Sequence, residues 1–360
     1  MSTHVSNGSF CVLPFIERFQ DLNGQTYFCC ESRIPLDAFD SVESNELRAK
    51  IYRGEKIKHC NSCYELEKNK VISSRLRESM NWLKDPEVKN YIDFWTPDQD
   101  LKTFLYDIRF DNKCNLACVS CNPKESSLWG KELKIDTDKY PLNFDINQCL
   151  SAKKIYLAGG EPLIIDEFVN LISKISELDQ QPELVINTNL TKINDKLKAT
   201  LSKIHKLCLT ISVDAYGQVN EYHRWPLSWN KFLNNLEWVR DIECTIRFNS
   251  VVNAVTVLNI HRLQEIEHYA DQWHLTILTT PPALQINNLP ETIKEQVLEN
   301  FSKIINSQFY QTDPVFKSTV DNIKIQIMKP GDHALLSLFL SGIDQRRNIN
   351  HINYLGVKLT

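Results

Sequence analysis

From about residue 104 onward, short runs rich in β-branched and aromatic residues alternate with segments whose apolar residues recur every three or four positions. Such alternation is typical of parallel strands joined by crossover helices. Six βα repeats are fewer than the eight of a closed barrel, so the sequence predicts an α/β fold with either a partial, open barrel or a doubly wound sheet. The expected strands are 104–110, 154–158, 184–188, 207–213, 244–251 and 275–279.

The regions on either side of this repeat have different patterns. Residues 1–100 are rich in cysteine and contain few long periodic runs, apart from a short helix-like stretch that ends at Gly54. After Pro290, apolar residues at helical spacing predict an amphipathic helix, followed by mixed segments. We therefore expect a small cysteine-rich module over 1–100, the barrel over 101–285, and a C-terminal α+β extension over 286–360.

The charge balance excludes some classes of function. The chain has 41 Lys and Arg residues against 45 Asp and Glu, a net charge of −4, which is too balanced for a dedicated nucleic-acid or membrane-surface protein. Residues 48–89 hold 11 basic and 6 acidic residues, which suits either a solvated surface or a docking face for an anionic partner. No apolar run approaches the roughly 18 residues that span a bilayer, and residues 1–15 lack the pattern of a secretory signal. We expect a cytoplasmic protein.

Eleven cysteines in a chain without an export signal favour metal binding or redox chemistry over disulfides. Cys114, Cys118 and Cys121 follow the first predicted strand with C-x3-C-x2-C spacing, where a loop can turn three thiolates toward one point. Three thiolates on a four-iron cluster leave one iron free to bind a substrate or cofactor. The alternative is a zinc site with a distant fourth ligand. Three isolated cysteines are expected to be buried apolar residues: Cys149, Cys208 and Cys244.

A second motif, Gly159-Gly160-Glu161-Pro162, comes directly after the second predicted strand and so at the carboxyl edge of the sheet. Two glycines let the backbone approach a ligand without interference from Cβ atoms. The carboxylate beside them can accept hydrogen bonds from a ligand ammonium group. Taken alone, the same four residues also suit a simple tight turn.

Together these two motifs resemble the radical S-adenosylmethionine (SAM) superfamily. Its hallmarks are a C-x3-C-x2-C loop after the first strand of a partial (βα)6 TIM-like barrel and a Gly-Gly-Glu-Pro motif after the second strand. The resemblance covers residues 104–280. It extends to residues at later strand ends, namely Thr188, Asn189, Ser212, Asp214 and Arg224.

The resemblance implies that Cys114, Cys118 and Cys121 hold a [4Fe-4S] cluster whose free iron chelates the amino and carboxylate groups of SAM. Glu161 would accept from the amino group, and Arg224 would pair with the carboxylate. Ribose hydroxyls or neighbouring polar atoms would meet Asn189, Ser212 and Asp214, and the same cofactor site would include Gly159, Gly160, Pro162 and Thr188. Without the resemblance, Ser212 and Asp214 also suit a strand-end turn, and Arg224 a surface ion pair.

The chain departs from the superfamily pattern at Ser120, where members usually have an aromatic residue just before the third cysteine. The adenine contact at this position is often made by the backbone. We therefore expect cofactor binding to persist with different packing around the base.

The N-terminal cysteines carry a second resemblance. Cys11 and Cys29, with Gly24 between them, are similar to the opening of the SPASM and twitch auxiliary-cluster modules, and Cys60 and Cys63 resemble their later C-x2-C pair. Those modules normally follow the barrel, whereas this pattern precedes it. The ligand count suits one further [4Fe-4S] cluster, with Cys30 as a possible substitute ligand. A zinc knuckle that stabilises a small domain is the alternative.

The resemblance implies an enzyme that reductively cleaves SAM to methionine and a 5′-deoxyadenosyl radical, which abstracts hydrogen from a substrate. The barrel would position the cofactor and exclude water. Proteins similar to the SPASM and twitch group commonly modify peptides or proteins, so a peptide or protein side chain is the expected substrate, with flavodoxin or ferredoxin as reductant. Alternatives are a small molecule such as a sugar, aminocyclitol or amino acid, a nucleic acid, and a non-catalytic iron–sulfur redox sensor or electron carrier.

Overall fold

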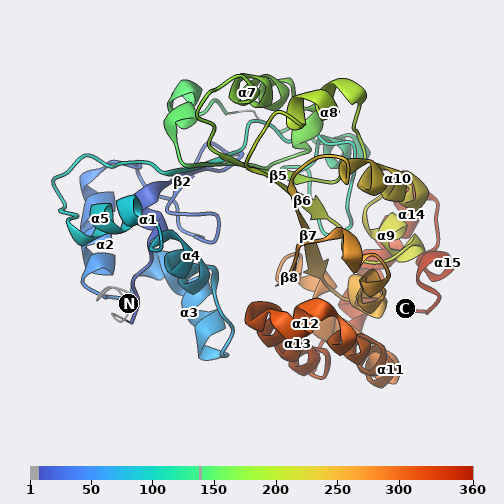
Figure 1. Ribbon diagram of the computed structural model, residues 1–360. Coiled ribbons are helices and arrows are strands. Elements are labelled where there is room, and N and C mark those ends of the chain that lie inside the picture. Colours follow the sequence, from blue (N-terminus) through green and yellow to red (C-terminus); the bar gives the residue numbers. More distant parts are fainter. Residues whose placement is uncertain (1–7, 138–139, 360) are drawn as a thin grey trace. The chain divides into compact units, whose positions relative to one another are not determined.

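The computed structural model describes residues 8–137 and 140–359 (Figure 1). The chain divides into two compact units. Unit 1 comprises Met1–Asp111, Asp138–Ala158 and Gln180–Leu184, and unit 2 comprises Asn112–Thr137, Gly159–Asp179 and Val185–Thr360. The fold is mixed α/β with mostly parallel strands, as the sequence predicts.

The strands of unit 1 follow the order β2-β1-β3-β4. Their bounds are Glu17–Gln20 for β1, Thr26–Tyr27 for β2, Leu105–Ile108 for β3 and Lys154–Leu157 for β4. Strand β1 pairs antiparallel with β2 but parallel with β3, and β3 pairs parallel with β4. Strands β1 and β2 have no counterpart in the sequence prediction, because β1 is short and polar and its parallel partner is more than 80 residues away in the chain.

The described residues of unit 1 form five α-helices: α1 (Leu13–Ile16), α2 (Val42–Tyr52), α3 (Asn61–Lys68), α4 (Ser74–Trp82) and α5 (Pro86–Asp93). The side chains of Ser41, Ser73 and Asp85 accept hydrogen bonds from the first turns of α2, α4 and α5, which satisfies backbone donors there. Helices α1, α2, α4 and α5 share one apolar core with the cysteine-bearing segments, in which Cys11 and Cys29 are buried. The N-terminal cysteines are therefore part of a packed structure.

Unit 2 contains most of β5 (Glu183–Thr188) and strands β6 (Leu207–Ser212), β7 (Thr245–Val252) and β8 (Gln272–Ile277), in that spatial order. Strands β6, β7 and β8 pair in parallel. Along β7, fully buried residues alternate with half-buried ones, so one face of this strand lies in the core and the other is partly accessible. Parallel strands bring their carboxyl ends to one edge, where the predicted site residues lie.

Crossover and C-terminal helices complete unit 2. The crossover helices are α6 (Ser127–Leu133), α7 (Asp166–Ser176), α8 (Asp195–Leu201), α9 (Gln218–His223) and α10 (Trp229–Val239). The C-terminal helices are α11 (Glu291–Ser302), α12 (Gln308–Thr312), α13 (Pro314–Ile327), α14 (His333–Arg347) and α15 (His351–Leu355). Helix α12 lies beside α13, and α13 packs on β8 (Figure 1).

The C-terminal region corrects one expectation. Between residues 286 and 359 the structure contains helices and no strand, so this region is helical rather than α+β. Buried apolar residues in α13 and α14 recur at helical spacing, which explains the difference: Phe316, Val320, Ile323, Ile327, Leu336, Leu340 and Ile343.

All six predicted strands are present, although β8 begins and ends two to three residues earlier than expected. Helix α7 buries Phe168, Leu171, Ile172 and Ile175, which confirms its predicted apolar face. Cys149 and Cys208 are buried as expected, whereas Cys244 is only half-buried. In the described part of the chain, every helix is too short or too polar to cross a bilayer.

Candidate active site

The loop that carries Cys114, Cys118 and Cys121, here called the cluster loop (residues 112–122), lies within unit 2. All three cysteines are half-buried. The loop is fixed by the end of α9 and the segment after it, because the Val119 N–H donates to the His223 carbonyl and the Ala117 N–H donates to the Trp225 carbonyl, each at 2.6 Å. The middle of the loop therefore has a defined backbone path.

Hydrogen-bond donors lie near the sulfurs of Cys114 and Cys118. The Leu116 N–H and the Asn189 amide lie 3.5 and 3.9 Å from Cys114 Sγ, and Arg224 Nη1 lies 3.9 Å from Cys118 Sγ. Donors at such positions stabilise thiolates, the form that ligates iron–sulfur clusters. The donor set thus fits a cluster. Within the described ranges, no three His, Cys, Asp or Glu side chains lie close enough together to hold a single metal ion. The ligands of a multi-iron cluster lie farther apart than the ligands of a single ion.

The turn after β4 requires both of its glycines. Gly159 and Gly160 have φ values of 88° and 54°, in the left-handed region that favours glycine. A Cβ atom on Gly160 would lie only 2.4 Å from the Lys113 carbonyl oxygen, while the Glu161 N–H donates to that same oxygen at 2.9 Å. The Gly-Gly-Glu-Pro motif is therefore held directly against the start of the cluster loop.

Glu161 is buried and accepts three hydrogen bonds from the chain. Its Oε1 accepts from Thr188 Oγ1 at 2.7 Å and from the Leu163 N–H at 3.2 Å, and its Oε2 accepts from the Asn189 N–H at 2.6 Å. A carboxylate has about four acceptor positions, so one remains on Oε2. The motif is thus held against the end of β5, and Pro162 begins the short helical turn that follows.

Replacing Glu161 by Gln removes a buried titratable group. Burial raises the pKa of Glu161 to about 7 despite the hydrogen bonds from Thr188, Asn189 and Leu163, which lower it. Because the unfolded value is about 4.3, the folded protein binds more protons than the unfolded chain between these pH values, and its free energy of unfolding falls as pH rises. Relative to Glu161→Gln, the parent should lose about 3 kcal/mol of stability from pH 4 to pH 8. Urea unfolding of both proteins measures the difference in their free energies of unfolding. A difference that stays constant from pH 4 to pH 8 would contradict the raised pKa of Glu161.

Asp214 and Arg224 form a buried pair at the end of β6. Asp214 Oδ2 lies 2.7 Å from Arg224 Nε and 2.9 Å from His223 Nδ1, and Oδ1 accepts from the Val251 N–H at 2.7 Å. Although burial opposes ionisation, Arg224 and His223 hold the pKa of Asp214 well below its usual range. Asp214 therefore orients Arg224, whose Nη1 points to Cys118. The sequence missed this role and also missed His223, which has no recognisable motif.

The remaining predicted residues of this site also lie in unit 2. Asn189 and Ser212 are at the ends of β5 and β6, and Ser212 Oγ lies 3.4 Å from Asn187 Oδ1. Ser120 is half-buried within the cluster loop. The structure thus brings Cys114, Glu161, Asn189 and Arg224 into one connected group. Contacts of Ser120, Ser212 and Asp214 with a cofactor stay predictions.

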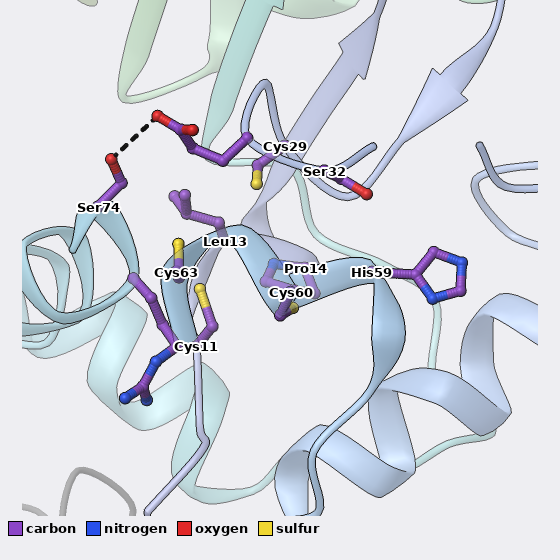
Figure 2. A pocket seen from close by; sticks show the side chains of 11 residues that line it. Cys11, Leu13, Pro14, Cys29, Ser32, His59, Cys60, Cys63 and Ser74 are labelled. Atoms are coloured by element: carbon purple, nitrogen blue, oxygen red, sulfur yellow. Dashed lines mark hydrogen bonds between the residues drawn. The ribbon is translucent and has the colours of Figure 1, made fainter. Parts of the chain in front are cut away.

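Unit 1 brings the four N-terminal cysteines around one cavity. Figure 2 shows Cys11 and Cys63 side by side with Cys29 and Cys60 on the same cavity. Cys11, Cys29 and Cys63 are buried and Cys60 is half-buried. Burial, and then the neighbouring Cys63 thiol, raise the pKa of Cys60 to about 12. Gathered buried thiols of this kind ionise readily only with a compensating cation.

An ion pair supports this cavity from one side. Arg75 is bound by both carboxylate oxygens of Glu67, and its Nη1 donates to the Phe10 carbonyl at 2.6 Å, next to Cys11. Sequence reasoning missed this pair, although both residues lie shortly after Cys63. His59 also lines the cavity, but Figure 2 shows its ring directed away from Cys11 and Cys63. Cys30 is exposed and is not among the residues that line the cavity.

The comparison with protein families defines the class of protein. Residues 108–273 match the family model of the Radical SAM superfamily. This stretch of the chain is therefore a radical SAM domain, and the chain is an enzyme.

Individual relatives are more distant. GTP 3′,8-cyclase of Clostridium perfringens (strain SM101 / Type A) is 26% identical over 151 residues, which cover 40% of this chain and 45% of the relative. The probable GTP 3′,8-cyclase of Methanocaldococcus jannaschii is 20% identical over 235 residues, or 63% of this chain and 76% of the relative. The match thus spans less than half the length of the Clostridium relative.

Solved structures with a similar arrangement include Streptococcus suis SuiB bound to S-adenosylmethionine, with a TM-score of 0.43 and 12% identity over 78% of this chain and 69% of that chain. Another is anSMEcpe with bound AdoMet, with a TM-score of 0.41 and 17% identity over 57% of this chain and 58% of that chain.

Proposed function

We propose that this enzyme cleaves SAM reductively at a [4Fe-4S] cluster held by Cys114, Cys118 and Cys121. The observation that carries the proposal is the convergence of donors on the cluster loop: Asn189 reaches Cys114, and Arg224 reaches Cys118. When bound and reduced, the cluster supplies the electron that converts SAM to methionine and a 5′-deoxyadenosyl radical, which abstracts hydrogen from the substrate.

The chain's own residues bind and orient SAM. Glu161 accepts from the SAM amino group at the free position on Oε2, and Arg224, fixed by Asp214, pairs with the SAM carboxylate. Asn189 and Ser212 contact the ribose, and the backbone at Ser120 contacts adenine. Gly159 and Gly160 permit the close backbone approach at this edge of the sheet.

A second [4Fe-4S] cluster is proposed for Cys11, Cys29, Cys60 and Cys63, in a SPASM/twitch-like module over residues 1–100. Four cysteines around one cavity support full ligation, and a fully ligated cluster transfers electrons or stabilises the module. Because Cys30 does not line the cavity, it is a weaker candidate for a cluster ligand than these four cysteines. The alternative in the same place is a zinc ion held by the four thiolates.

Metal analysis distinguishes these two readings. Anaerobically reconstituted protein should contain about eight iron atoms per chain, and Cys63→Ala should contain about four, because one of two four-iron clusters is lost. Cys149→Ala, which removes a buried cysteine outside both sites, is the control and should retain the parent content. Zinc in place of iron, lost selectively from Cys63→Ala, would exclude the second cluster.

For the substrate we propose a peptide or protein side chain, which the resemblance of the N-terminal cysteines to SPASM and twitch modules supports. A purine nucleotide is the second candidate, because the relatives in the sequence comparison are named GTP 3′,8-cyclase. The proposed reductant is flavodoxin or ferredoxin, and the proposed compartment is the cytoplasm.

Isotope transfer separates the candidates. If the substrate is a peptide, peptides with deuterated side chains should place deuterium in 5′-deoxyadenosine, as mass spectrometry detects. Deuterium from labelled GTP and from no peptide would favour the nucleotide. A protein that binds both clusters but yields no 5′-deoxyadenosine under any condition would instead support a redox sensor.

A further inference from the structure

A buried arginine from the C-terminal helix α14 reaches the cluster loop. Arg347 Nη2 donates a hydrogen bond to the Ala117 carbonyl at 2.7 Å, and the Arg347 side chain is only 2% exposed. Its Nε lies 3.2 and 3.3 Å from the two carboxylate oxygens of Glu132 on α6. Ala117 directly precedes Cys118, so this contact fixes the backbone beside a proposed iron ligand.

A tryptophan completes the support. The Arg347 guanidinium lies over the Trp129 ring, 4.8 Å from its centre, and Trp129 Nε1 donates to the Cys118 carbonyl at 2.7 Å. Neighbouring carbonyls of the cluster loop are thus held by two stacked side chains. Among the described residues, the buried Arg347 Nη1 has no hydrogen-bond partner.

The positive charge of Arg347 is only partly neutralised by Glu132. Glu132 is shared between two arginines, with Arg346 Nε at 3.6 Å and Arg347 Nε at 3.2 Å. The side chain of Arg346 is 38% exposed, so solvent screens its charge. Arg347 is buried, where charges interact more strongly, and its hydrogen bond to the Ala117 carbonyl places its charge next to the residue that precedes Cys118.

We propose that Arg347 is a positioning residue for the cluster loop and that its buried charge raises the reduction potential of the SAM-binding cluster. The inference rests on the proposed placement of this cluster at Cys114, Cys118 and Cys121. Reduction adds a negative charge to the cluster, and a nearby buried cation stabilises the reduced form. Net charge and hydrogen bonding are among the factors that set such potentials.

The test is a redox titration followed by electron paramagnetic resonance, performed on Cys63→Ala protein so that only the first cluster contributes. In this background, Arg347→Gln should shift the midpoint potential to more negative values. Arg347→Lys should keep the potential close to that of the protein with Arg347, because it retains the positive charge. Arg346→Gln is the matched control from the next position of α14 and should leave the potential close to the parent value.

Glu132→Gln provides a reciprocal variant that does not depend on the folding of Arg347→Gln. Because it removes the negative charge beside Arg347, the potential should become more positive. Unchanged potentials in Arg347→Gln and Glu132→Gln, with the cluster signal intact, would overturn the inference about Arg347 but not the proposed placement of the cluster. Absence of a reducible cluster in the Cys63→Ala background would instead contradict the proposed placement of the cluster. If Arg347→Gln fails to hold a cluster, the directions of the Glu132→Gln and Arg347→Lys shifts decide the question.

Discussion

Replacing Cys118 by Ala should abolish 5′-deoxyadenosine formation while the protein stays folded. The change removes a proposed iron ligand, so the loss should exceed the roughly 10–100-fold cost of removing an outer partner of a metal ligand. The fold should persist because Cys118 is half-buried in a loop whose backbone is held by neighbouring residues. Mass spectrometry of the product and circular dichroism of the variant measure the two outcomes.

Cys208→Ala is the matched control for this variant. Cys208 is a buried cysteine within β6 in the same unit, outside the proposed cluster site. It should retain product formation and iron content. If Cys118→Ala unfolds globally, or if it retains turnover, the cluster loop does not have the role assigned to it.

Replacing Asp214 by Asn should strongly lower the free energy of unfolding. The substitution keeps an oxygen for the Val251 N–H but removes the negative charge that pairs with Arg224. Breaking a buried ion pair on one side leaves an uncompensated charge and costs about 3–5 kcal/mol. Urea unfolding of the parent and the variant measures the difference in free energy of unfolding.

The control for Asp214→Asn makes the same substitution in an ion pair on the surface. Asp241 lies 2.7 Å from Lys198, and its side chain is 72% exposed. Because water screens such a pair, Asp241→Asn should leave the free energy of unfolding close to that of the parent. Equal effects of the two substitutions would show that the Asp214 pair contributes little.

Local patterns in the sequence were sufficient for the main strands and for the two central motifs. Short runs rich in β-branched and aromatic residues predicted β3 to β8. The cysteine spacing and the Gly-Gly-Glu-Pro motif indicated residues that the structure brings together, since Cys114 and Glu161 both contact Asn189. These features depend on residues close together in the chain, so local sequence contains them.

Features that depend on distant partners were missed. Strand β1 is defined by its pairing with β3, and the contact of Arg347 with Ala117 joins residues 230 positions apart. Asp214 was predicted as a cofactor contact, which stays a prediction, whereas its buried pairing with Arg224 was not foreseen. The C-terminal region was also predicted as α+β, whereas its buried apolar residues recur at helical spacing in α13 and α14.

The most direct test of the central claim is 5′-deoxyadenosine formation by anaerobically reconstituted parent protein given SAM and a strong reductant, beside Cys118→Ala. We predict product from the parent and none from the variant. Absence of product from the parent, with iron confirmed at Cys114, Cys118 and Cys121 and in the presence of both candidate substrate classes, would contradict reductive cleavage of SAM at this site.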